Sequence, residues 1–413
     1  MIKAVVAFAG NRDAYQLPLA LYEGGLLEAL VTDIYWPLDR KWFERLVQAW
    51  RDDTGRLPHA LESRYCLNLG SHKVKISTLA FMGFGLSLLY SNQQLANFRN
   101  EALSRKSAKV AKASDSALFS YSYYAFEAFQ RQESRYRFLF QIHPHPISTR
   151  RILQEELELT PAGAASLKAE PDLALAKADF DKLAAEPHLA NGWVVASHFT
   201  AQTLIENGIA RDKIYVVPYG VDPGRFPPRT SCPPTNQPLT IIFAGSMIQR
   251  KGLSYALEAI RLLKTKHIRV ILAGRGFCDT HLLNQYKDLP LEIKIGLPQK
   301  EFVQQIHQSD IMLFPSLVEG FAHVLLETMA CGLPILATPH TCAPDLIEDG
   351  RQGFIVPIRN AQAIAEKLQW CLENRSTVTE MGLAAAAQAQ LFSWERFRAG
   401  VRSAYQQMLT VAE

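Results

Sequence analysis

Residues 311–338 constrain the fold of this chain more than any other stretch, and they read IMLFPSLVEGFAHVLLETMACGLPILAT. An apolar run, Ile311 to Phe314, ends at Pro315. After a short loop, a helical pattern runs from about Ala322 to Ala330 and stops at Gly332, and a second apolar run follows. A strand, a loop, a helix and a strand in this order predict one unit of a parallel β-sheet covered by helices.

Two glutamates flank the point where the predicted strand ends and the helix begins. Glu319 lies in the loop, and Glu327 lies about one turn into the helix. The carboxyl ends of strands form the ligand crevice of open α/β sheets, and a helix N-terminus there suits a phosphate. Carboxylates accept hydrogen bonds from sugar hydroxyls. The pattern therefore predicts a site for a ligand with phosphate and sugar, unless the glutamates are only solvated charges at the rim of the sheet.

Similar apolar runs recur in two sets, on either side of a segment rich in proline. The first set is 3–9, 29–35, 117–121, 138–142 and 192–197, and the second is 239–245, 268–274, 292–296, 311–315, 333–338 and 353–357.

The separating segment, residues 223–238, holds six prolines and has almost no hydrophobic periodicity, which predicts a linker. We expect an α/β protein of two Rossmann-like, doubly wound domains facing a central cleft. The expected boundaries are 1–222 and 239–390. Residues 391–413 are expected to form a terminal helix that crosses back to the first domain.

The whole chain excludes several classes of function. Its 413 residues carry a formal net charge of only +4 and no motif for binding nucleic acid. The six cysteines are scattered without a CxxC pair, so we expect neither a disulfide framework nor a zinc site. The N-terminus reads as a first strand and not as a signal peptide, and no apolar run is long enough to span a membrane. We therefore expect a cytoplasmic protein.

One short apolar segment, residues 76–90, is relevant to the location of the protein in the cell. It follows His72, Lys73 and Lys75 and contains two glycines. Such a segment fits a buried helix of the first domain, or one that faces an acceptor. The alternative is a helix that touches a membrane surface, which would make the protein peripheral at the cytoplasmic face of the membrane.

Three motifs together resemble retaining glycosyltransferases of family 4. Glu319-Gly320-Phe321-Ala322 with Glu327 resembles the E-x7-E signature, whose loop is typically EGFG. The segment from Gly245 to Gly252 resembles the G-R-x4-K-G element, with Ser246 in place of the arginine. Pro218 to Asp222 resembles the element that closes the first domain, with Tyr219 where asparagine is usual. The resemblance implies the GT-B fold and transfer of a hexosyl group from a UDP- or GDP-sugar to a glycan, lipid or small-molecule acceptor.

The resemblance also implies roles for individual residues. Lys251, helped by Arg250, would hold the diphosphate and stabilise the leaving group, while Glu327 would bind the ribose and Glu319 the donor sugar. The rest of the donor loop and helix start would add backbone N–H groups: Gly320, Phe321, Ala322, His323 and Val324. No metal or cofactor is expected besides the nucleotide-sugar co-substrate, because Lys251 and the helix dipole would replace a metal.

Two further candidates come from the first domain. His143, directly after a predicted strand, would face the reacting centre, and His145 is the alternative. A metal site made by both histidines lacks further ligands, and a rigid polar loop is the plain reading. Gly10 follows the first strand and would face the diphosphate, although a simple tight turn explains it equally well.

Other functions remain open at this point. A sugar-nucleotide epimerase of the same fold would lack a second substrate site. Ser246 and Ala322, which replace residues usual in the family, keep a silent nucleotide-sugar-binding protein as a second alternative. The expected partners are a nucleotide-sugar donor and an unidentified acceptor, which could be lipid-linked, and no nucleic acid.

Overall fold

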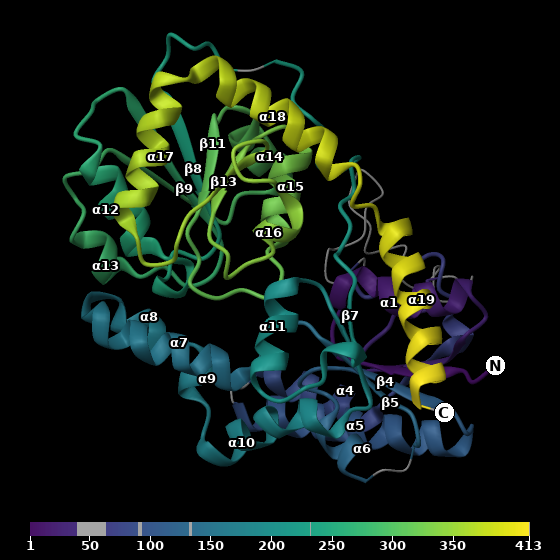
Figure 1. Ribbon diagram of the computed structural model, residues 1–413. Helices are drawn as coiled ribbons and strands as arrows, with labels where there is room; N and C mark the ends of the chain where they lie inside the picture. The colour runs from purple at the N-terminus through teal and green to yellow at the C-terminus, as the bar shows by residue number, and fades with distance from the viewer. Residues whose placement is uncertain (39–62, 90–92, 132–133, 232, 413) are drawn as a thin grey trace.

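Two parallel β-sheets, each with helices on both faces, form the two lobes of the molecule (Figure 1). The computed structural model describes residues 1–38, 63–89, 93–131, 134–231 and 233–412. The other residues, which belong to the expected first domain (39–62, 90–92 and 132–133), linker (232) and terminal helix (413), lie outside that description. The fold class predicted from the sequence is confirmed.

The N-terminal sheet has the strand order β3-β2-β1-β4-β5-β6-β7, and its neighbouring strands are all parallel. Its strands are β1 (Ala4–Ala7), β2 (Leu27–Thr32), β3 (Val74–Ile76), β4 (Ala117–Tyr121), β5 (Arg137–Gln141), β6 (Gly192–Val195) and β7 (Ile214–Val216). Its helices are α1 (Gln16–Glu23), α4 (Thr78–Leu89), α5 (Gln93–Ala113), α6 (Phe126–Gln130), α7 (Pro146–Leu159), α8 (Ala164–Lys168), α9 (Pro171–Ala174), α10 (Lys177–Ala185) and α11 (His198–Glu206).

The C-terminal sheet has the order β10-β9-β8-β11-β12-β13 and is also parallel. Its strands are β8 (Leu239–Ala244), β9 (Ile268–Gly274), β10 (Leu291–Ile295), β11 (Ile311–Phe314), β12 (Ile335–Ala337) and β13 (Gly353–Ile355). The helices that follow them are α12 (Leu253–Leu262), α13 (Thr280–Asn284), α14 (Gln299–His307), α15 (His323–Ala330), α16 (Ala343–Leu346), α17 (Ala361–Glu373), α18 (Arg375–Ala389) and α19 (Trp394–Ala412).

In each sheet the strand order reverses at one point, and the candidate sites lie at these two points. In the first sheet β1 lies between β2 and β4, and in the second β8 lies between β9 and β11. Loops leaving the two central strands diverge to opposite faces, so a crevice opens at the carboxyl ends. Both sheet centres are fully buried, as covered parallel sheets require: β1, β4, β8 and β11 contain no exposed residue.

The last helix, α19, returns to the N-terminal domain and lies beside α1 (Figure 1). It buries Phe397, Val401 and Tyr405 at helical spacing, and the Tyr405 hydroxyl donates to the Ile2 carbonyl at 2.9 Å. On its outer side, Arg398 and Arg402 both pair with Glu23. The chain therefore ends as part of the first lobe.

Helices α7–α9, which we call the arm, extend from the first lobe beneath the second (Figure 1). The Glu156 side chain of α7 is fully buried, where it accepts from Gln249 at 2.6 Å and pairs with Arg359 at 2.9 Å. Ser166 of α8 accepts the N–H of Gln249 at 3.1 Å. Because a buried carboxylate is costly without such partners, these contacts fix the two lobes against each other.

Within the segment 76–90, Ile76 ends β3 and Thr78–Leu89 form α4, while residue 90 and the side chains beyond Phe84 are outside the described part. Leu79, Phe81 and Met82 of α4 have exposed fractions of 52%, 47% and 47%. The expectation that this helix is buried is therefore wrong for these three side chains. Within the described ranges, no helix is both long and apolar enough to cross a bilayer.

Candidate active site

A cavity of about 620 Å³ opens at the carboxyl ends of β8 and β9, at the crevice of the second sheet. The loops after the two strands form one wall, and α15 forms another through Val324 and Glu327. Further lining residues are Arg225, Phe226, Gly245, Ser246, Arg250, Lys251, Gly274, Arg275, Gln299 and Phe302. Four of the predicted donor-binding residues, Arg250, Lys251, Val324 and Glu327, thus share one cavity.

Arg250 and Lys251 lie in a short 3-10 turn, Gln249–Lys251, which leads into α12. Gly252 ends this turn at φ 72°, and a Cβ there would lie 2.0 Å from the Pro315 carbonyl oxygen. Only glycine fits this position, because both the left-handed backbone and the close approach exclude a side chain. The close packing brings the two basic residues against the loop that follows β11.

That loop supplies Glu319, whose carboxylate contacts both cations. Arg250 Nη1 lies 2.9 Å from Glu319 Oε2, and Lys251 Nζ contacts the same oxygen. Burial alone would raise the pKa of Glu319, but Lys251 and Arg250 outweigh it and lower the pKa to about 2. Arg250 also reaches Glu170 in the arm, with Nε 3.0 Å from its Oε2. The site therefore brings two basic side chains, Arg250 and Lys251, together with the carboxyl groups of Glu319 and Glu170.

The Glu319 loop touches the N-terminal domain through Gly320. A Cβ on Gly320 would lie 2.1 Å from the Ile142 carbonyl oxygen, just beyond β5. Ser197 Oγ of the first domain donates to the Gly320 carbonyl at 2.6 Å. The missing side chain therefore lets the donor loop lie directly on the strand end that carries His143.

Replacing Gly320 with alanine is expected to push the donor loop away from His143. The added methyl would overlap a backbone oxygen that has no room to move, and a displacement of about 1 Å costs about 100-fold in rate. Glycosyl transfer measured at saturating donor checks this. The control is Gly350→Ala, whose Cβ would meet nothing within 4 Å, although the φ of Gly350, unlike that of Gly320, is positive. Equal activity of both variants would show that this contact does not position the loop.

His143 lies beside this cluster, and its imidazole is uncharged at neutral pH. Burial lowers its pKa to about 4, although the nearby Glu319 carboxylate opposes the shift. Its ring packs edge-on against Tyr123 with centroids 5.6 Å apart. His145 has a different position: it is fully buried at the start of α7, where Nδ1 accepts the Ile147 N–H at 3.3 Å. The structure thus brings His143, and not His145, to Glu319.

The amino end of α15 adjoins the same loop. Ala322 is its N-cap residue, and no side chain accepts from the first turn. The Leu325 N–H already donates to the Ala322 carbonyl at 3.0 Å, so within the described residues the N–H groups of His323 and Val324 are the ones available to an anion. Phe321 and His323 pack on Tyr219, whose ring centroid lies 4.5 Å from that of His323 in a stacked arrangement. Burial lowers the pKa of His323 to about 4, so this ring adds no charge.

Glu327 lies one turn further along α15 and faces the cavity. Burial raises its pKa to about 7, and Arg225 only partly opposes this shift. The structure gives its carboxylate no hydrogen bond to a described side chain. Such a carboxylate has its full capacity to accept hydrogen bonds from a ligand.

Gly10 lies apart from this set. Its N–H donates to Asp33 Oδ1 at 3.0 Å, and Arg64 pairs with the same oxygen. It does not line the cavity beside α15. The sequence analysis did not predict Glu170. Its partner Arg250 lies in the other domain, so no local sequence pattern marks the pair.

Comparisons with known proteins show that the second domain is similar to glycosyltransferases. Residues 231–388 match the family model of "Glycosyl transferases group 1". The chain is 31% identical over 226 residues to the amylovoran biosynthesis glycosyltransferase AmsK of Erwinia amylovora, covering 52% of this chain and 54% of that protein. It is 33% identical over 184 residues to the putative colanic acid biosynthesis glycosyltransferase WcaL of Escherichia coli, covering 42% and 45%. The chain spans about half the length of the curated relatives it matches.

Solved structures match over the whole chain. Sucrose-phosphate synthase from Thermosynechococcus elongatus superposes with a TM-score of 0.66 at 15% identity, covering 98% of each chain. Anabaena HepE in complex with UDP superposes with a TM-score of 0.60 at 14% identity, covering 98% of this chain and 100% of that one. At such identities the likeness concerns the fold, and the fold is the two-domain GT-B architecture expected from the motifs.

Proposed function

We propose that the protein is a retaining glycosyltransferase of family 4 that moves a hexosyl group from a nucleotide diphosphate sugar to an acceptor hydroxyl. The observation that carries this proposal is the joint contact of Lys251 and Arg250 with Glu319, at the open amino end of α15 and beside His143. The match of residues 231–388 to the group 1 model supports it, because this range contains every one of these groups except His143.

The site is suited to a diphosphate. Arg250, Lys251 and Val324 of the first turn of α15 line one cavity, where an anion would be stabilised by charge and by the helix dipole. In the ligand-free protein Glu319 takes this anionic role. A bound diphosphate would replace the Glu319 carboxylate on Lys251 and Arg250, and Glu319 would turn to the hydroxyls of the transferred sugar.

In a transfer that takes place in a single step, retention requires that the acceptor approaches from the face that the phosphate leaves. The acceptor oxygen bonds to the anomeric carbon as the bond from that carbon to the diphosphate oxygen breaks, and the electron pair goes to the phosphate. The departing phosphate is close enough to take the hydroxyl proton. Lys251 stabilises the charge that develops on it. Neutral His143 can hydrogen-bond to the reacting sugar without adding charge.

A panel of UDP-, GDP- and ADP-sugars tests this function. The correct donor should raise the melting temperature, because a ligand of the native state stabilises it by mass action. The same nucleotide sugar should also serve as the donor in glycosyl transfer to an acceptor. Rearranged nucleotide sugar without an acceptor would identify an epimerase instead, and binding without turnover would identify a silent binding protein.

The binding of the donor should depend on pH through Glu327. The raised pKa of about 7 means that this group is protonated below neutrality in the free protein. Ribose hydroxyls donate to the ionised carboxylate, so nucleotide affinity should rise with pH up to about 7 and level off above it. Glu327→Gln should bind more weakly above pH 7 and lack this rise. A calorimetric titration between pH 5.5 and 8.5 measures it, and an unchanged slope in the variant would remove Glu327 from the ribose.

We also propose that α4 contacts an anionic membrane surface on the cytoplasmic side, where a lipid-linked acceptor would be reached. Three exposed apolar side chains of α4 and the exposed Phe98 of α5 support this contact. The exposed bases Arg105 and Lys106 follow on α5.

Co-sedimentation with vesicles that contain anionic lipid checks the membrane contact. Phe81→Glu should weaken binding at least about tenfold, because one such side chain contributes ~1.5–3 kcal/mol when buried. Leu383→Glu on α18 is the control, since Leu383 is 63% exposed in the other lobe. Equal loss in both variants, or no binding by the unmodified protein, would contradict the proposal.

A further inference from the structure

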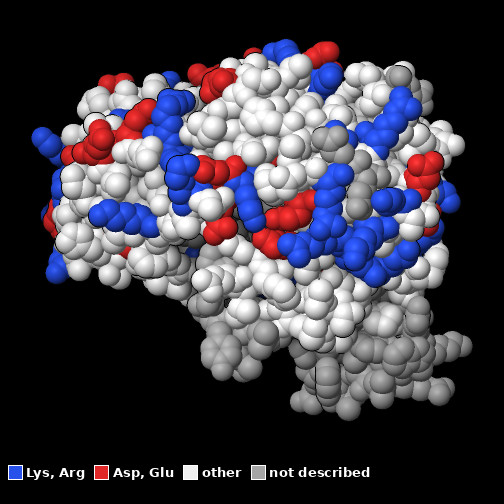
Figure 2. Space-filling view, turned by 90° about the horizontal axis from the view of Figure 1, so that it is seen from below, with Lys and Arg blue, Asp and Glu red and all other residues white. Residues whose placement is uncertain are grey.

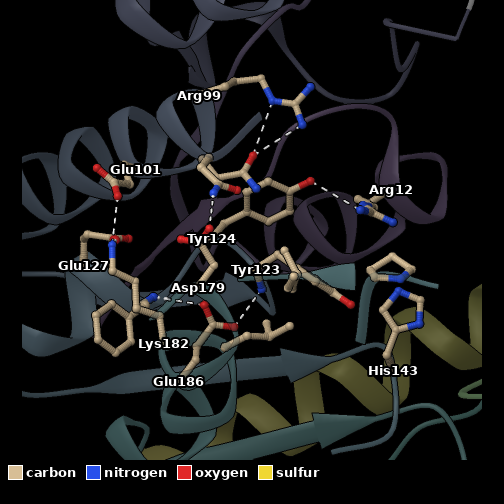
Figure 3. A pocket seen from close by; sticks show the side chains of 16 residues that line it. Arg12, Arg99, Glu101, Tyr123, Tyr124, Glu127, His143, Asp179, Lys182 and Glu186 are labelled. Carbon is tan, nitrogen blue, oxygen red and sulfur yellow. Dashed lines mark hydrogen bonds and ion pairs between the residues drawn. The ribbon is translucent and has the colours of Figure 1, made fainter. Parts of the chain in front are cut away.

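A second cavity, of about 350 Å³, lies in the N-terminal domain at the carboxyl ends of β1, β4 and β5 (Figure 3). His143 lines it, as do Arg12 after β1 and Tyr123 and Tyr124 after β4. The outer wall comes from α5 and α10. This cavity occupies the crevice of the first sheet, as the donor cavity occupies that of the second, and the backbone of His143 lies against Gly320 in the Glu319 loop.

The charges in this cavity are distributed unevenly. Lys182 is neutralised, since its Nζ lies 3.0 Å from Glu101 and 3.3 Å from Glu127. Arg12 and Arg99 are different: within the described part of the chain, no carboxylate lies at ion-pair distance from either guanidinium. Arg12 Nη2 donates to the Tyr124 hydroxyl at 3.3 Å, and Arg99 donates to Asn100 Oδ1 at 3.3 Å.

Figure 3 shows Arg99 at the top of the view and Arg12 at the right, with the Glu101, Glu127 and Lys182 group toward the left. In the view of Figure 2, many basic side chains gather on the right of the molecule, beside a smaller acidic group. Two guanidiniums in a concave site without carboxylate partners are suited to a phosphate or carboxylate, which they bind in a planar, bidentate manner.

The backbone that carries Arg12 is strained. Asp13, Ala14 and Tyr15 follow it with φ of 42°, 49° and 64°, a left-handed run without glycine. Such residues cost about 1–3 kcal/mol each and persist where the surroundings hold them, commonly at functional sites. Here Asp13 Oδ2 accepts from the Tyr121 hydroxyl at 2.5 Å and from the Leu17 N–H at 3.3 Å. These contacts hold Arg12 at the cavity.

The loop that carries Tyr123 and Tyr124 is also held in place by hydrogen bonds. Glu186 is buried, and its carboxylate accepts the N–H groups of Tyr123 at 2.7 Å, Ala125 at 2.9 Å and Phe126 at 3.0 Å. The loop after β4 is thereby held with both tyrosines at the cavity. Aromatic faces suit the apolar faces of a sugar ring, and Asp179, which accepts from Asn97 at 2.9 Å, can accept from hydroxyls.

We propose that this cavity binds the acceptor, and that the acceptor is a saccharide with an anionic group, held by Arg12 and Arg99 while a sugar hydroxyl reaches His143. The inference rests on the proposed transferase function and adds the chemical class of the second substrate. The phosphate of a glycosyl phosphate and the carboxylate of a uronic acid share the required chemistry.

Three saccharide probes of similar size test the inference: glucose 1-phosphate, glucuronic acid and methyl glucoside. Their binding is measured by calorimetry with the donor site saturated by the preferred nucleotide. At least one anionic probe should bind about tenfold or more tightly than the neutral one, as charge-assisted hydrogen bonds are worth ~1.5–3 kcal/mol. The phosphate and carboxylate arms identify which anion is recognised.

Arg12→Gln and Arg99→Gln should each abolish this preference, whereas Lys109→Gln, an exposed base on α5, should keep it. The melting temperature shift produced by the nucleotide should be the same in all three variants. A neutral probe that binds as tightly as both anions, or an unchanged preference in the arginine variants, overturns the inference, as does the absence of binding by all three probes. If no nucleotide binds, the transferase proposal is refuted instead. The three saccharide probes are then titrated into the Lys251→Ala variant, with and without the Arg12 and Arg99 substitutions, to show whether the anion preference still depends on these arginines.

Discussion

Lys251→Ala is expected to reduce glycosyl transfer about 100- to 1,000-fold, which corresponds to ~2.7–4 kcal/mol of lost transition-state stabilisation. The ammonium is held in a buried position by Glu319 and lies against the Phe314 ring, so its place is set before the donor arrives. A preorganised cation of this kind acts on the charge that develops on the leaving phosphate. The effect should therefore appear in kcat more than in donor affinity.

Initial rates at saturating donor measure this loss. Lys264→Ala is the control, because Lys264 is an exposed base just beyond the same helix, α12. A melting curve of each variant separates a folding defect from a catalytic one. Turnover within twofold of the unmodified enzyme would show that Lys251 does not act on the leaving group.

Glu319→Gln is expected to have two opposite effects on stability. Without ligand, the variant should be less stable by about 3 kcal/mol, because two partly buried cations lose a shared carboxylate. With the preferred nucleotide diphosphate, the variant should gain more stability than the unmodified protein, since the phosphates restore the missing negative charge. Transfer should fall as well, because the amide replaces the carboxylate that would accept from the donor sugar.

The pH dependence provides a separate check on Glu319. Its pKa of about 2 in the folded protein is below its ordinary value of 4.5, so its contribution to stability is present above about pH 4.5. That contribution is lost as the pH falls through about 2. The difference in unfolding free energy between the two proteins should thus be full at pH 7 and shrink in acid. Glu366→Gln, at an exposed site on α17, should show no such difference. A larger nucleotide effect in the unmodified protein would contradict the charge-replacement argument.

The second domain was predictable because its buried strands are nearly continuous apolar runs, and the residues at their ends are close in space by topology alone. Lys251 after β8 and Glu319 after β11 meet because these strands are neighbours. The first domain carried weaker signals. Arg12 has no motif, and its place depends on three residues in left-handed conformation that no propensity favours. The sequence preferred His143 to His145 only because His143 directly follows the strand, and the packing of α7, which uses His145 as its cap, gives the physical reason.

The contact between Glu319 and the two cations also bears on how the enzyme responds to salt. A phosphate arriving at Lys251 and Arg250 meets charges that are already balanced, so binding exchanges one anion for another. Few small ions need to be released in such an exchange. For the proposed donor site, nucleotide-sugar affinity should consequently vary little with ionic strength.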